Sequence, residues 1–196
     1  MSRRVEIIMP DAGPLISLAM GGALDTLLLV DVPIRIVDQV LYEVTKSDKY
    51  PGAKEVKEFV AAHPKSILKT DTNVGRLAAM EREINPNANQ RGLGDAAVAE
   101  FMGRLDEYIA SDAPVLLVYE DGDLNSIRIT HARRVHLIGT REFLVGLERS
   151  KLIPSAKEIV DRVIGLGRNP STRTSEQPAD TDQGPSVWLP PRPRLG

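Results

Sequence analysis

The sequence of 196 residues contains no cysteine, and this absence excludes disulfide bonds, cysteine-based zinc sites and thiolate nucleophiles. Only three histidines are present, and His131 and His136 do not have the spacing of two ligands on one helix face, which argues against zinc. No apolar run approaches the roughly eighteen residues of a membrane span, and Asp11 interrupts the opening segment before any secretory-length apolar core. We therefore expect a soluble, cytoplasmic protein without a membrane segment.

Several catalytic motifs are also missing. There is no P-loop and no G-x-S-x-G nucleophile elbow, which disfavours NTPases and serine hydrolases. The run RGLGDAA fits a dinucleotide-binding glycine pattern, but it follows a polar loop where that site requires a strand. Asp11 lacks the acidic neighbour or D-x-D pattern of phosphoaspartate enzymes. The formal net charge of −2 gives no overall attraction to nucleic acid, so any RNA binding requires a local basic patch or a bound metal.

What the sequence does contain is an alternation of short apolar runs and amphipathic segments. Such alternation predicts an α/β fold with a parallel sheet of about four to five strands. The near-continuous hydrophobicity of residues 114–119 predicts a strand buried on both faces, near the sheet centre. The other expected strands are 5–9, 33–37, 66–70 and 135–139, and the expected helices are 15–29, 38–47 with Asp38 as N-cap, 53–63, 71–84, 95–110, 124–134, 140–152 and 155–166.

The domain organisation follows from a change in composition. Residues 1–167 are expected to form one domain, because about this length with 42% hydrophobic residues suffices for one core. Residues 168–196 are crowded with proline, serine, threonine and charge, which predicts a disordered tail. Its ending, VWLPPRPRLG, fits either a polyproline II ligand of an aromatic groove or a solvated tail.

Four acidic residues stand where strands end or helices begin. Asp11 and Asp121 each follow a predicted strand, Asp95 opens a predicted helix, and Glu43 borders the apolar stripe of another. Singly, each has an ordinary explanation as a turn residue, a cap or a surface charge. Together they fall at the carboxyl edge of a parallel sheet, where functional crevices lie. Converging carboxylates repel one another unless a cation neutralises them, so the pattern predicts a Mg²⁺ or Mn²⁺ site and metal-assisted hydrolysis.

The order and spacing of these acids resemble those of the PIN-domain family of metal-dependent ribonucleases, known as the toxin half of VapBC-type toxin–antitoxin pairs. The resemblance covers about residues 5 to 155. Four segments resemble the four family motifs in order: IIMPDAGPLISLA, QVLYEVTK, GLGDAAVAEF and VYEDGDL. They place Asp11, Glu43, Asp95 and Asp121 as the principal acids, with Asp123 as a secondary one.

The resemblance implies a three-layer α/β/α fold and a Mg²⁺- or Mn²⁺-dependent endoribonuclease. Asp11, Asp95, Asp121 and Asp123 would hold metal, and Glu43 would orient the attacking water. Cleavage of RNA would leave a 5′-phosphate and a 3′-hydroxyl. The family also implies a homodimer and a small antitoxin protein as partner.

Substrate contacts are expected from arginines near these motifs. Arg91, Arg128, Arg133 and Arg134 are candidates for binding RNA phosphates, although a solvated helix face explains Arg133 and Arg134 equally well. Single-stranded or looped RNA is the expected substrate, because its bases and backbone are accessible.

The fourth motif departs from the family pattern. Tyr119 replaces a small hydroxyl residue, and Glu120 adds a carboxylate, so the fourth acid is open among Glu120, Asp121 and Asp123, with Asp121 favoured. These departures keep a second interpretation alongside the nuclease. In it, the chain is a catalytically impaired PIN-like scaffold that binds RNA or a protein partner.

Overall fold

A central parallel sheet organises the chain. The structure, a computed structural model, describes residues 5–110, 113–120 and 135–170. In this part of the chain five parallel strands lie in the order β3-β2-β1-β4-β5, which confirms the predicted α/β class. Their bounds are β1 Ile7–Pro10, β2 Ile34–Val37, β3 Ile67–Thr70, β4 Val115–Tyr119 and β5 Val135–Gly139.

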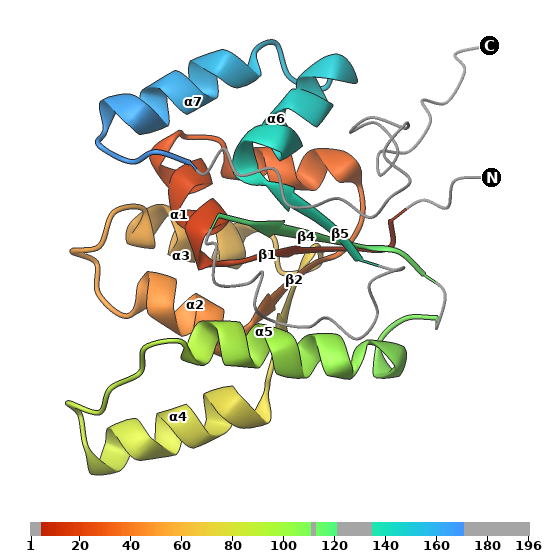
Figure 1. The fold of residues 1–196 in the computed structure, drawn as a ribbon. Coiled ribbons are helices and arrows are strands. Elements are labelled where there is room, and N and C mark those ends of the chain that lie inside the picture. Colours follow the sequence, from red (N-terminus) through yellow and green to blue (C-terminus); the bar gives the residue numbers. More distant parts are fainter. Residues whose placement is uncertain (1–4, 111–112, 121–134, 171–196) are drawn as a thin grey trace.

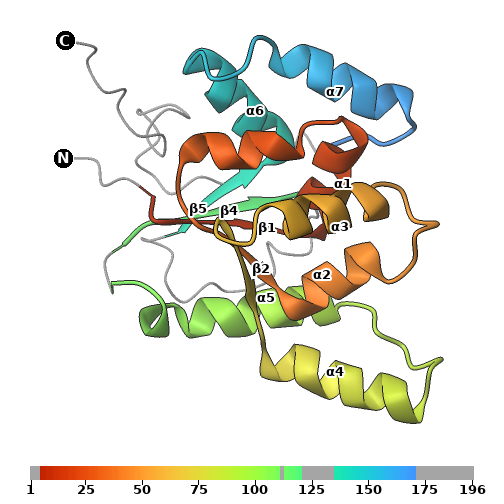
Figure 2. The same ribbon diagram turned by 180° about the vertical axis from the view of Figure 1, so that it is seen from behind.

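Helices cover both faces of the sheet and give three layers (Figures 1 and 2). Helices α1 and α6 pack on one face with α7 outside them, and α5 packs on the other with α4 beyond it. The bounds are α1 Ala12–Met20, α2 Asp38–Thr45, α3 Ala53–Ala62, α4 Asn73–Ile84, α5 Leu93–Gly103, α6 Thr140–Arg149 and α7 Ala156–Gly165, with 3₁₀ helices η1 Leu24–Val30 and η2 Leu105–Glu107. The expected helix 124–134 lies outside the described residues.

The middle of the sheet is the most apolar part of the molecule. Every residue of β1 and of β4 is buried, and these two strands pair in register from Ile7 with Val115 to Pro10 with Val118. Strand β1 lies at the centre with β4 beside it, so the prediction that 114–119 lies near the centre is confirmed. Strands buried on both faces are typical of parallel sheets, and they hold the carboxyl ends of β1 and β4 rigidly side by side.

The single helix predicted over 15–29 is wrong. The chain breaks at Gly21 and Gly22, and the two helices, α1 and η1, are bent by 115°. Gly22 has a φ of +60°, which favours glycine. A Cβ on Gly21 would lie 2.9 Å from a methyl of Val163, so this glycine also lets α7 pack against α1. Among the described residues no single helix has the length and apolarity to span a membrane; only this bent pair has them jointly.

Asp38 does not cap its own helix in the way its sequence position suggests. Helix α2 begins at Asp38 itself, and Val37 is the N-cap. The Asp38 carboxylate accepts hydrogen bonds from the backbone N–H of Thr72 at 3.0 Å and from its hydroxyl at 2.8 Å. Gly75 lies so close that a Cβ there would overlap this carboxylate. Asp38 thus fastens the start of α4 to the end of β2.

Candidate functional site

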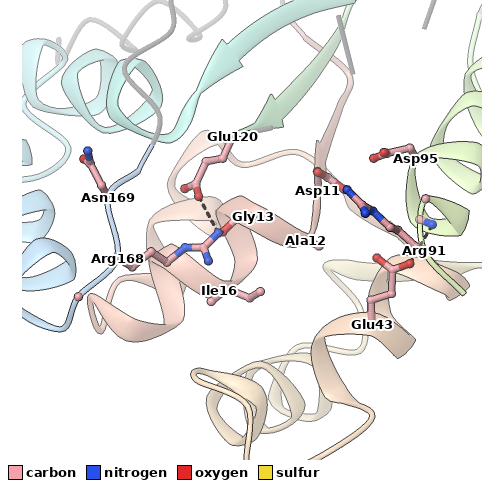
Figure 3. A pocket seen from close by; sticks show the side chains of 13 residues that line it. Asp11, Ala12, Gly13, Ile16, Glu43, Arg91, Asp95, Glu120, Arg168 and Asn169 are labelled. Atoms are coloured by element: carbon pink, nitrogen blue, oxygen red, sulfur yellow. Dashed lines mark hydrogen bonds and ion pairs between the residues drawn. The ribbon is translucent and has the colours of Figure 1, made fainter. Parts of the chain in front are cut away.

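A cavity of about 630 Å³ opens at the carboxyl ends of β1 and β4. Its lining comes from the first turns of α1 and α5, from α2, and from the segment that follows α7 (Figure 3). The ionisable groups in this lining are Asp11, Glu43, Arg91, Asp95, Glu120 and Arg168. The cavity therefore lies where ligands bind in parallel α/β folds, at the carboxyl edge of the sheet.

Asp11 stands directly after the central strand. Its backbone N–H donates to the carbonyl of Val118 at 2.9 Å, which extends the β1–β4 pairing by one residue. Its side chain is 5% exposed and does not cap α1, although Asp11 is the N-cap residue of that helix. Sheet pairing therefore fixes the position of this carboxylate at the cavity wall.

Glu43 reaches the same cavity from the middle of α2, and it lies against the backbone of α5. Its Oε1 accepts the N–H of Gly94 at 2.9 Å. A Cβ on Gly94 would lie 2.5 Å from Oε2, so a larger residue would have to displace the carboxylate from this position. The glycine that precedes Asp95 in the sequence GLGD is thus explained by contact with Glu43.

The environment of Glu43 disfavours its negative charge. Burial raises the pKa of Glu43, the hydrogen bonds from Gly94 and Gln39 lower it in part, and the negative charge of Asp95 raises it. Asp95 lies in the first turn of α5 and is half-buried. Two carboxylates thus interact unfavourably across the cavity, and a bound cation would relieve this repulsion.

Arg91 lies in the loop that leads to α5, and a polar cluster holds that loop against α2 and α4. The guanidinium of Arg82 lies 3.6 Å from the ring centroid of Tyr42, and Nη1 donates to the side-chain oxygens of Gln39 at 3.2 Å and Gln90 at 2.5 Å. In Figure 3 the Arg91 side chain extends among Asp11, Glu43 and Asp95. The cluster therefore holds the loop from which Arg91 extends its guanidinium toward the three acids.

Glu120, the first residue after β4, lies on the opposite side of the cavity from Glu43 (Figure 3). Its side chain is 7% exposed, and three groups bind it. Oε1 accepts the Thr140 hydroxyl at 2.5 Å, and Oε2 accepts the Ser17 hydroxyl at 2.9 Å and Nη2 of Arg168 at 2.9 Å. A Cβ on Gly13 would lie 2.8 Å from Cβ of Glu120, so glycine is needed here too. Three protein donors therefore already bind Glu120, which makes it a weaker candidate for the fourth acid than a carboxylate without such donors.

The departure at Tyr119 also has a structural counterpart. The Tyr119 side chain is 3% exposed, and its hydroxyl has no hydrogen-bond partner among the described residues. The carboxylate that follows β4, Glu120, instead accepts a hydrogen bond from the hydroxyl of Thr140, at the start of α6.

Arg168 belongs to the segment that sequence composition assigned to the tail. Gly167, with φ +84°, ends α7, and the N–H of Arg168 donates to the carbonyl of Val163, which is the bonding of a Schellman motif. This turn brings Arg168 to Ser17, Gly13 and Glu120. The described chain thus continues past the boundary predicted at 167.

The structure brings together four of the predicted site residues and leaves the rest open. Asp11, Glu43, Asp95 and Arg91 line one cavity. The other predicted residues, Asp121, Asp123, Arg128, Arg133 and Arg134, lie outside the described residues. Arg168 also lines the cavity, although it was not predicted as a site residue. Its signal in the sequence is the helix-ending glycine of GLGR.

The acidic side chains of the cavity are its candidate metal ligands. As they stand, no three acidic or histidine side chains among the described residues are close enough to share one ion. The donors are nevertheless all carboxylates, which suit Mg²⁺ or Mn²⁺. Four carboxylates and two guanidinium groups give the lining a formal charge of −2 when all are ionised. This charge and the raised pKa of Glu43 make the cavity suited to a divalent cation.

Comparisons were made with protein-family models, with curated proteins and with solved structures, and none of them matches the chain.

Proposed function

We propose that the chain is a Mg²⁺- or Mn²⁺-dependent ribonuclease of the PIN-domain type. One observation supports this most strongly: Asp11, Glu43 and Asp95, which are far apart in the sequence, line one cavity at the carboxyl edge of the sheet. Metal-assisted hydrolysis of a phosphodiester uses such a set of acids to hold a cation that offsets the phosphate charge.

The roles of the residues follow from their surroundings. Asp11 and Asp95, with Asp121, would hold the ion, which when bound supplies charge stabilisation to the phosphodiester and acidifies water. Glu43 is suited to accept a proton from the attacking water, because burial raises its pKa and the N–H of Gly94 fixes its position. Arg91 would contact the phosphate from the same side of the cavity.

The test is cleavage of a mixed RNA pool in Mn²⁺ and in EDTA. Wild type should cleave only with the metal, and Asp95→Asn should lose about 100-fold or more, because removing several kcal/mol of transition-state stabilisation has this effect. Asp48→Asn is the matched control, since Asp48 is exposed and pairs with Lys57 on the surface, outside the cavity lining. Equal cleavage by wild type and Asp95→Asn would contradict the proposal.

The catalytically impaired scaffold is the second candidate, supported by the buried Tyr119 hydroxyl, which has no partner in the described part of the chain. Calorimetric titration with Mn²⁺ separates the two candidates. A nuclease should bind Mn²⁺ and lose this binding in Asp11→Asn and Asp95→Asn, whereas a scaffold without catalysis should bind RNA but no metal. The toxin role, an antitoxin partner, a homodimer and a cytoplasmic location belong to the same proposal and depend on the family resemblance.

A further inference from the structure

We propose that Arg168 is a phosphate-binding residue for the nucleic-acid backbone, on the opposite side of the cavity from Arg91, and that Glu120 is its positioning residue. This inference goes beyond the arginines expected from the sequence and depends on the proposed function for its choice of RNA as ligand. It is carried by the hydrogen bonds of the guanidinium and by the difference in exposure between the two partners.

The hydrogen bonds leave one nitrogen of Arg168 available. A guanidinium carries five N–H donors. The Nε hydrogen donates to the Ser17 hydroxyl at 2.7 Å, and Nη2 donates to the carbonyl of Gly13 at 3.3 Å and to Glu120 at 2.9 Å. The described part of the chain offers no acceptor to Nη1, so its two hydrogens remain for a ligand.

The Arg168 side chain is more exposed than that of Glu120, as a binding site for an anion requires. The Glu120 side chain is 7% exposed, whereas the Arg168 side chain is 32% exposed and lines the cavity. Figure 3 shows the guanidinium extending past Gly13 toward Glu120, at one end of the cavity that Asp11, Glu43 and Asp95 line at the other. A structural ion pair alone would not require that the cation face the cavity while the anion is covered.

The fixed geometry gives Arg168 an advantage over a mobile surface arginine. Ser17 is fully buried, and its hydroxyl both accepts from Nε of Arg168 and donates to Glu120. The guanidinium is therefore oriented before a ligand arrives, which reduces the side-chain entropy lost on binding. A backbone phosphate is the fitting ligand, because guanidinium N–H groups form short, charge-assisted hydrogen bonds with phosphate oxygens.

The experiment measures binding of a fluorescein-labelled single-stranded RNA by fluorescence anisotropy in EDTA and in Ca²⁺, over a series of KCl concentrations. Each phosphate neutralised in a single strand contributes about 0.7 to the slope of log K against log salt. Arg168→Gln should reduce the slope by about 0.7 and weaken binding about 5-fold at about 0.1 M salt. Arg76→Gln is the matched control, because Arg76 is exposed on α4 and bonds only to Asn73, and it should change neither value.

Glu120→Gln gives the deciding measurement. It removes the charge that neutralises Arg168, so it should tighten RNA binding several-fold, opposite in sign to Arg168→Gln. If the pair were only structural, both variants would lower the melting temperature and weaken binding together, which would overturn the proposal. An unchanged salt slope in Arg168→Gln with intact cleavage would overturn this inference and leave the ribonuclease standing. RNA binding that depends on Arg168 without any cleavage would support the inference and reject the nuclease, and no RNA binding by wild type would reject both.

Discussion

The contact between Gly94 and Glu43 leads to a prediction whose sign depends on two opposing effects. Replacing glycine by alanine within a helix stabilises it by up to about 1 kcal/mol. In α5, however, the new Cβ of Gly94→Ala would lie 2.5 Å from Oε2 and 3.0 Å from Cδ of Glu43. Crowding in a packed region costs about 1–3 kcal/mol, and displacing the carboxylate also removes its bond to the Gly94 N–H. We expect net destabilisation of about 1–2 kcal/mol, or a fall in Tm of about 3–6 °C.

The same helix contains the control. Gly103 is the last residue of α5, and a Cβ there meets no heavy atom within 4 Å. Gly103→Ala should therefore leave Tm unchanged or raise it slightly. In a Glu43→Ala background the obstruction is gone, so adding Gly94→Ala should no longer destabilise. The measurement is thermal unfolding of the four variants by circular dichroism. A rise in Tm for Gly94→Ala in the wild-type background would show that the close contact, and with it the argument for this glycine, is wrong.

Three further predictions concern the groups that hold the site together. Gly75→Ala should destabilise by about 3 kcal/mol in urea unfolding, because its Cβ would overlap the Asp38 carboxylate. Burial raises the pKa of Glu43, so the folded state holds its proton longer and the stability that this residue contributes falls as pH rises from below about 4.5 toward neutral; the unfolding free energy of wild type relative to Glu43→Gln should therefore fall over this range in urea titrations at several pH values. Thr140→Val should lower the unfolding free energy by about 1–3 kcal/mol, because Glu120 then loses a buried donor.

Each of these has a result that would contradict it. A Gly75→Ala variant as stable as wild type would mean that Asp38 does not fasten α4. Parallel pH profiles for wild type and Glu43→Gln would mean that Glu43 titrates normally in the folded protein. Thr140→Ser keeps the hydroxyl and serves as the control for Thr140→Val, which keeps the methyl group and loses the hydroxyl; a Thr140→Val variant as stable as wild type would mean that the bond to Glu120 contributes no stability.

Hydrophobic patterning was sufficient to predict the sheet and its edge. The apolar run at 114–119 and the position of Asp11 after a strand each depend on a short stretch of sequence, and both predictions agree with β4 and β1. The acids that share the cavity could be anticipated because parallel strands present their carboxyl ends on one side.

The remaining features could not be predicted, because they depend on contacts between distant residues. At the bend, Gly21 packs against α7, about 140 positions later in the chain. Asp38 has the sequence signature of an N-cap, yet its carboxylate is used by Thr72. Arg168 follows a helix-ending glycine within a polar stretch, and only the fold reveals Glu120 as its partner. A single sequence does not show which distant residues contact one another in the folded protein.

Two glycines at equivalent positions connect the stability of the site to its charge. Gly13 and Gly94 are each the second residue of a helix, and each allows a carboxylate to lie against that helix's first turn. Helix N-termini stabilise negative charge, so the first turns of α1 and α5 offset part of the cost of burying these two carboxylates. An anionic strand would then meet a lining with net negative charge, and fixed arginines alone leave it at −2. For a protein that binds RNA through basic residues only, divalent cations weaken binding by competing for phosphate. Here we expect Mn²⁺ to strengthen RNA binding, because one ion offsets the negative charge of the surface that the phosphate must approach.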